Sequence, residues 1–368
     1  MSTALSGPAM ALGQGMKLGV EIYFAEINKA GGVHGNSLQL IVLDDGYEPG
    51  LAAPNMRHLI DQEQVLAVLG NVGTPTAIVT VPIAKEKKTL LFGAFSGSDV
   101  LRHQPPDRYV INFRASYSEE LSTMIDGLLG AGIKPEEIAF FTQNDGYGDA
   151  GYRGGVQALT HRGYGPLIEQ LAHGRYTRNT LNIEDGLSTI LEAEIEPKAI
   201  IMVGTYKPCA VFIQTARADL PDTLFLNVSF VGSIPLLQEL GPLGEGVIVT
   251  QVVPNVTSDV DAVRHYHQAL KEYQPDAQPG SISLEGYLVA KIFVEGVRLA
   301  GENPTREGLV DAMERISNFD LGTGQSVSFS PMEHQASHKV WPTVINHGRY
   351  VDLDWSTINR SPKPSSAP

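Results

Sequence analysis

The stretch 66–101 constrains the fold more than any other part of the chain, because its sequence pattern predicts strand, tight loop and helix twice in succession. Apolar runs at 66–69 and 89–92 have the length and composition of buried parallel strands. A short loop of small residues follows each run, with Thr74 predicted as a helix N-cap after the first and Ser96 in the second. Both loops therefore lie at the carboxyl ends of neighbouring strands, where open α/β sheets bind ligands and a helix N-terminus favours an anion.

Strands and helices alternate in the same way on both sides of this stretch. Before it, we expect an amphipathic helix at 9–30, a strand at 38–43 and a helix at 49–63. After Tyr117 the alternation begins again and predicts a second parallel sheet. Further predicted elements are helices at 119–129, 150–159, 187–194, 208–216, 260–273, 281–300 and 304–316, and strands at 109–113, 138–142, 199–203, 224–227 and 246–253. The sequence therefore predicts an α/β fold with two similar lobes, followed by β-hairpin material after Gly322.

Composition excludes several classes of protein. The chain has 368 residues, enough for two lobes with full cores, and a formal net charge of −14, which argues against a nucleic-acid partner. A run of about 18 apolar residues is missing, so no membrane-spanning helix is predicted. The single cysteine, Cys209, cannot form an internal disulfide. The first residues, MSTALSGP, lack the charged and apolar regions of a signal peptide, and we expect a start from which an export signal and most of a first strand are missing.

The motifs that could carry catalysis or bind a metal fail on spacing or context. The glycines around Ser96 are not spaced as in a nucleophile elbow. His334 and His338 are four residues apart but lie in a predicted loop, without the glutamate that follows the first histidine of a zinc helix. Asp44 and Asp45 end a predicted strand and are expected to cap a turn, since no third acidic ligand lies at suitable spacing. We therefore predict no enzyme, no metal site and no cofactor.

Short motifs follow one another in a fixed order along nearly the whole chain, and none of them is specific alone. They lie at 5–8, 27–32, 43–45, 70–76, 94–96, 147–148, 204–206 and 285–287. Together, their order and spacing resemble those of type I periplasmic binding proteins of the branched-chain amino acid group, which serve ABC transporters. This resemblance implies two Rossmann-like lobes with a ligand cleft between them and a hinge that crosses three times, near residues 117, 251 and 328. Lobe one would comprise 1–117 plus 252–328, lobe two 118–251 plus 329–355, and 356–368 would form a tail.

The resemblance also implies a ligand site. In lobe one, Thr74 would bind the carboxylate of an amino acid, and the Ala94 carbonyl and Ser96 hydroxyl would face its ammonium group. Phe95 and Val72 would line the pocket. Lobe two would contribute Tyr147 and Tyr206 over the ligand.

One position departs from the pattern of the resembling proteins. They carry a glutamate against the ammonium group, and Ser229 stands at the matching place here. A neutral hydroxyl cannot pair a buried ammonium group, which costs several kcal/mol when left unpaired. Either Glu285 or Asp145 supplies the charge, or the ligand is a small aromatic or aliphatic carboxylate without an amine.

The resemblance implies a periplasmic monomer that hands a small molecule to a membrane permease. Two rivals from other classes remain. The lobes could form the sensing domain of an amide or amino acid receptor or regulator, and an α/β enzyme could use the same edge of the sheet.

Overall fold

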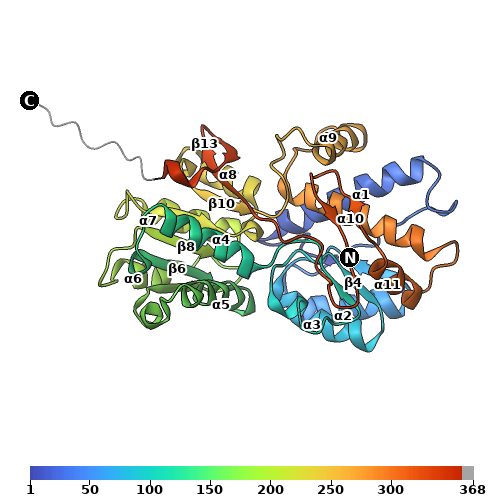
Figure 1. The fold of residues 1–368 in the computed structure, drawn as a ribbon, viewed down its shortest axis with the longest axis horizontal. Coiled ribbons are helices and arrows are strands. Elements are labelled where there is room, and N and C mark those ends of the chain that lie inside the picture. Colours follow the sequence, from blue (N-terminus) through green and yellow to red (C-terminus); the bar gives the residue numbers. More distant parts are fainter. Residues whose placement is uncertain (359–368) are drawn as a thin grey trace, which may run out of the picture.

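The computed structural model describes residues 1–358 and shows two α/β lobes side by side, joined by extended segments of chain (Figure 1). The α/β fold with two lobes is thus confirmed. Of the predicted tail, residues 359–368 lie outside the described part, and the residues before them enter a short 3-10 helix, η6 (Trp355–Thr357).

The lobe that contains the amino terminus is built on short parallel strands. Strands β3 (Ala67–Leu69), β4 (Leu90–Phe92) and β5 (Val110–Ile111) pair in that order, and β1 (Ser2–Thr3) pairs with β2 (Leu43–Asp44). Buried apolar side chains fill every position of β3 and β4, as expected for strands covered on both faces. The other elements of this lobe are α1 (Met10–Lys29), α2 (Pro49–Asp61), α3 (Thr74–Glu86), η1 (Asp99–Leu101), α9 (Asp261–Tyr273), α10 (Ser281–Ala300), α11 (Arg306–Glu314), β11 (Phe319–Asp320) and β12 (Ser326–Val327).

The other lobe has one larger, mixed sheet of seven strands in the order β14-β13-β10-β9-β8-β6-β7. Its parallel part comprises β6 (Ile138–Gln143), β7 (His173–Tyr176), β8 (Ala199–Val203), β9 (Leu224–Asn227) and β10 (Ile248–Gln251). The hairpin of β13 (Trp341–Asn346) and β14 (Arg349–Asp352) adds antiparallel to β10. Its helical elements are α4 (Tyr117–Gly130), η2 (Pro135–Glu137), α5 (Gly146–His161), η3 (Gly165–Gln170), α6 (Glu184–Leu191), α7 (Tyr206–Ala216), η4 (Ser229–Val231), α8 (Ser233–Leu240) and η5 (Gly241–Gly244).

The seven-stranded sheet thus draws its strands from residues 138–251 and 341–352, and the smaller sheets draw theirs from 2–111 and 319–327. Two of the segments that run between the lobes touch, because Asn112 and Gln335 form a parallel bridge. We propose lobe boundaries at 117, 251 and 328.

Helices α1 and α10 pack backbone against backbone in the amino-terminal lobe. A Cβ added at Gly19 would lie 2.0 Å from the Ser283 carbonyl oxygen, and one added at Gly286 would lie 2.5 Å from the Met16 carbonyl oxygen. Only glycine permits so close a crossing. This contact fixes the position of Glu285, the neighbour of Gly286 on α10.

The elements of the structure differ from the predicted ones in three ways. The strand expected at 38–43 is formed only at its end, by Leu43–Asp44, because β1 is the strand that pairs with it and is two residues long. Strand β7 and helix α8 were not predicted, because their short segments lack a clear period. Helix α6 begins three residues before the predicted start of 187.

Candidate functional site

The two loops predicted to bind the ligand are joined by an extension of the β3–β4 pairing. The Phe95 amide donates to the Asn71 carbonyl oxygen over 2.8 Å, and the Gly73 amide donates to the Phe95 carbonyl oxygen over 3.1 Å. Val72 and Phe95 form a parallel bridge between these bonds, and both are buried. The loops therefore hold their side chains at fixed positions relative to one another.

These loops bring the hydroxyl groups of Thr74 and Ser96 together. Their oxygens lie 2.7 Å apart, and both side chains are buried. The role of Thr74 as N-cap was wrong: the cap is Gly73, at a φ of 107°. Gly73 is required there because a Cβ would lie 2.2 Å from the ring of Tyr47. Since Thr74 is the first helical residue, its hydroxyl is not used as a cap. The Ala94 carbonyl oxygen accepts from the Ser96 amide over 2.8 Å.

Five buried aromatic side chains lie around this hydroxyl pair and join the two lobes. Their ring centroids are 4.6 Å apart for Tyr147 and Phe230, 5.3 Å for Phe95 and Phe230, and 5.4 Å for Tyr117 and Tyr147. The fifth ring, of Tyr47, is 6.0 Å from Phe230. Phe95 and Tyr47 belong to the amino-terminal lobe, Tyr147 and Phe230 belong to the second lobe, and Tyr117 lies at the proposed boundary as the first residue of α4. We call Tyr47, Phe95, Tyr117, Tyr147 and Phe230 the ring cluster.

The two tyrosines predicted in lobe two have different surroundings. Tyr147 belongs to the ring cluster, and its hydroxyl donates to the Gly204 carbonyl oxygen over 3.2 Å. Tyr206 is buried at the start of α7, where burial raises its pKa and a hydrogen bond with the Ala11 backbone opposes the rise. Among the described residues, no hydrogen bond or ring contact joins Tyr206 to the ring cluster.

Ser229 does not stand alone in the site, because Glu120 and Arg114 lie beside it. Its amide and hydroxyl donate to the two Glu120 carboxylate oxygens over 2.7 and 2.9 Å, and the Arg114 guanidinium donates to its hydroxyl. Thr250 donates to Glu120 as well, over 2.5 Å. A buried glutamate therefore binds Ser229 directly.

Glu285 also faces Arg114, with 3.6 Å between Nε and Oε1, while Glu120 Oε1 lies 3.9 Å from the guanidinium. All three side chains are buried. Burial raises the pKa of Glu285 to about 7 and raises that of Glu120, while Arg114 opposes both shifts. Burial disfavours the charge of Arg114, but Glu285 and Glu120 outweigh this and raise its pKa. One cation and two acids, one of them titrating near neutrality, make this a nearly neutral cluster.

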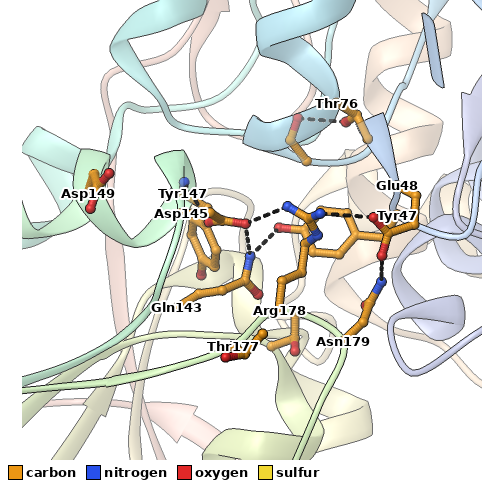
Figure 2. Close-up of polar contacts among 12 residues, drawn as sticks. Tyr47, Glu48, Thr76, Gln143, Asp145, Tyr147, Asp149, Thr177, Arg178 and Asn179 are labelled. Atoms are coloured by element: carbon orange, nitrogen blue, oxygen red, sulfur yellow. Dashed lines mark hydrogen bonds and ion pairs between the residues drawn. The ribbon is translucent and has the colours of Figure 1, made fainter. Parts of the chain in front are cut away.

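A second polar group connects the lobes at the edge of the ring cluster (Figure 2). Glu48, from the loop before α2, accepts from Arg178 over 2.8 Å and from Asn179 over 2.6 Å. Gln143 donates to the Tyr47 hydroxyl over 3.2 Å. Asp145 accepts from Arg178 over 2.9 Å and caps α5 by accepting from the Tyr147 amide. We call Tyr47, Glu48, Gln143, Asp145, Arg178 and Asn179 the rim bridge.

The structure thus brings Val72, Thr74, Ala94, Phe95 and Ser96 together, and it links Ser229 to Glu285 through Arg114. Sequence reasoning missed three groups of residues. Their members are Arg114 and Glu120, Tyr47 and Phe230, and the rim bridge residues Arg178 and Asn179. For Arg114, the available signal was a single charged residue directly after the predicted strand that ends at Phe113. The contacts of the other missed residues join positions that are distant in sequence, so no local pattern indicates them.

The residues expected to be structural have ordinary partners. Asp44 accepts from the Leu5 and Gly46 amides, as a turn cap does. His334 bonds to the Val110 carbonyl and to Glu314, and His338 bonds to Glu119. Of the helices in residues 1–358, none has the length and apolar character that a membrane crossing requires.

Comparisons with known proteins agree with this architecture. The family model described as "Periplasmic binding protein" matches residues 1–349. The "Leu/Ile/Val-binding protein homolog 7" of Brucella abortus (strain 2308) is 24% identical over 311 residues, which cover 79% of this chain and 74% of that protein.

Two solved structures are similar over nearly the whole chain. A possible leucine/isoleucine/valine-binding protein from Rhodopirellula baltica SH 1 is 47% identical, with a TM-score of 0.94 and coverage of 97% of this chain and 96% of that one. A substrate-binding periplasmic protein from Ralstonia solanacearum is 26% identical, with a TM-score of 0.87 and coverage of 96% and 98%. The chain therefore belongs to the type I periplasmic binding proteins, in the branched-chain amino acid family of solute-binding proteins.

Proposed function

We propose that this chain is the extracytoplasmic solute-binding protein of an ABC transporter and that it binds an amino acid, branched-chain or related, between its lobes by hinge closure. The observation that carries the proposal is the buried pair of hydroxyl groups formed by Ser96 and by Thr74, the first residue of α3. Rings from both lobes lie beside this pair. Hydroxyls and a helix N-terminus together favour a carboxylate. We further propose a periplasmic monomer whose macromolecular partner is a membrane permease.

The charges near the site favour a second candidate, a small carboxylate without an amine. An ammonium group needs an acid that is free to pair with it. Glu285 already faces Arg114, and Asp145 already binds Arg178. The same small-carboxylate or amino acid chemistry would also serve a sensing domain of a receptor or regulator.

A thermal-shift screen over amino acids and small carboxylates tests the proposal, because a ligand that binds only the folded state raises the melting temperature. We expect a rise with at least one member of these two classes. Calorimetry with an amino acid and its deamino analogue then separates the candidates. Tight amino acid binding that is lost in Glu285→Gln supports the first candidate; equal or better binding of the analogue, with Glu285→Gln silent, supports the second.

Substitution of the hydroxyl pair tests where the ligand binds. Thr74→Ala should weaken binding by roughly 1–3 kcal/mol, the cost of a lost hydrogen bond to a charged group. Thr80→Ala is the matched control, because Thr80 is buried on the same helix and its hydroxyl bonds to the Thr76 carbonyl. Calorimetry should show weaker binding for Thr74→Ala and for the double variant Thr74→Ala/Ser96→Ala. The Thr80→Ala control should bind as tightly as the wild type. Unchanged affinity in the double variant would move the site elsewhere.

A further inference from the structure

Phe230 occupies the middle of the ring cluster. It lies on η4, directly after Ser229, and its side chain is 0% exposed. Its ring contacts Tyr147 of its own lobe, at 4.6 Å, and Phe95 and Tyr47 of the other lobe, at 5.3 and 6.0 Å. A single side chain of lobe two therefore fills the space between rings of both lobes.

This ring also lies next to the expected anion site. Phe95, which contacts Phe230, directly precedes Ser96 in the sequence. The Arg114 guanidinium lies over the ring of Phe95, 4.5 Å from its centroid. Tyr117 lies near both members of the hydroxyl pair: burial raises its pKa, and the Arg114 charge and the nearby Ser96 and Thr74 hydroxyls oppose that rise. If a carboxylate binds Thr74 and Ser96, Phe95 and Tyr117 are the rings beside it, and Phe230 packs against Phe95.

Two of the neighbouring rings, those of Tyr147 and Tyr47, are held by polar contacts, whereas the ring of Phe230 is not. The hydroxyl of Tyr147 binds the Gly204 carbonyl, and the hydroxyl of Tyr47 accepts from Gln143. Phe230 has no polar atom in its side chain and is held by packing alone. Removal of its ring would leave an apolar cavity lined by aromatic side chains, and such cavities stay dry and bind flat apolar molecules.

We propose that Phe230 is the specificity-determining residue of the cleft: its ring restricts the substituent of the bound carboxylate to a small aliphatic group. The inference rests on the proposed function. Loss of the ring opens the space that an aromatic substituent needs, while the hydroxyl pair that binds the carboxylate stays in place. Discrimination by the size of a buried apolar substituent typically reaches 10- to 200-fold.

Calorimetry on the full chain with four probes tests this proposal. The probes are L-valine and its deamino analogue 3-methylbutanoate, and L-phenylalanine and its deamino analogue 3-phenylpropanoate. Whether the cleft accepts the amino acids or the deamino analogues, the aromatic and the aliphatic probe of the same class are compared. Phe230→Ala should raise the affinity for the aromatic probe relative to the aliphatic one by roughly tenfold or more. Phe225→Ala is the matched control, because Phe225 is 1% exposed on β9 and its ring faces Arg217 instead of the cleft.

Phe230→Leu, which keeps most of the apolar volume, serves as a second variant if Phe230→Ala does not fold by circular dichroism. It should shift the preference in the same direction by less. An unchanged ratio in a folded Phe230 variant, or an equal shift in the Phe225 control, would overturn the proposal. If neither wild type nor variant binds any of the four probes while the thermal-shift screen finds another ligand, the proposed function stands and the inference is overturned; if the screen finds no ligand either, both fail.

Discussion

Glu285 is a buried acid whose charge changes near neutral pH. It is buried beside Arg114, and its pKa rises from 4.5 to about 7. The folded chain therefore holds the proton more tightly than the unfolded chain does between these values. The free energy of unfolding should fall as pH rises from about 4.5 to about 7, and the full loss, at most about 3 kcal/mol, should be present above pH 7.

Glu285→Gln should remove this loss, since a neutral amide has no proton to release. Relative to wild type, the variant should gain roughly 1–3 kcal/mol between pH 5 and pH 8. Urea unfolding at the two pH values measures it, with the exposed Glu302→Gln as the control. The assignment is wrong if Glu285→Gln and wild type lose stability equally over this range.

Residue-level prediction from sequence reached the side chains that follow strands. Thr74 and Ser96 were found because each stands in a loop directly after an apolar run, and the structure joins them at 2.7 Å. Arg114 and Glu120 were missed because their contacts with Ser229 span more than 100 residues and leave no local pattern. The charge balance of the site could not be predicted for that reason.

At the scale of elements, the crossing of α1 and α10 should be sensitive to any added side-chain volume. A Cβ at Gly19 would lie 2.0 Å from the Ser283 carbonyl oxygen, so Gly19→Ala must push two backbones apart. We expect a loss of roughly 1–3 kcal/mol or more in the free energy of unfolding, as overpacking typically causes. Chemical denaturation measures this loss.

Gly50→Ala is the control for this substitution. Gly50 lies in α2 with no atom within 4 Å of an added Cβ, so alanine there should stabilise by up to about 1 kcal/mol through helix propensity. Equal effects of the two substitutions would mean that the helices do not pack as closely as described.

Element boundaries were predictable where the period of apolar residues was long. Helix α10 has the predicted bounds, and α11 lies within the predicted 304–316, with the N-cap Thr305 accepting from the Gly308 amide. The strand at 38–43 failed because strand formation requires a partner, and β1 offers only two residues. Pairing is a long-range property, so an apolar alternating run alone cannot establish it.

At the scale of the whole molecule, polar contacts cross between the lobes in addition to the buried ring cluster. Glu48 binds Arg178 and Asn179 in the rim bridge, and Arg153 binds Asp99 over 2.9 Å from helix α5 to η1 of the other lobe. Each crossing pair is partly exposed and worth at most about 1 kcal/mol. Such energies fit the proposed hinge closure, because each pair shifts the ratio of closed to open forms only several-fold.

Glu48→Gln should therefore move the ligand-free chain toward an open form. The substitution keeps the size of the side chain but removes the charge that faces Arg178, so the closed form should lose roughly fivefold in population relative to the open one. Small-angle X-ray scattering should show a larger radius of gyration than for wild type at low salt, and the difference should shrink as salt screens the pair. Asp126→Asn, which breaks the Asp126–Arg162 pair between α4 and α5 of one lobe, should leave the radius unchanged.

A saturating ligand should restore the wild-type radius of Glu48→Gln but bind it with weaker affinity, since binding must supply the lost closure energy. An identical radius and affinity for Glu48→Gln and wild type would mean that the rim bridge does not hold the lobes together.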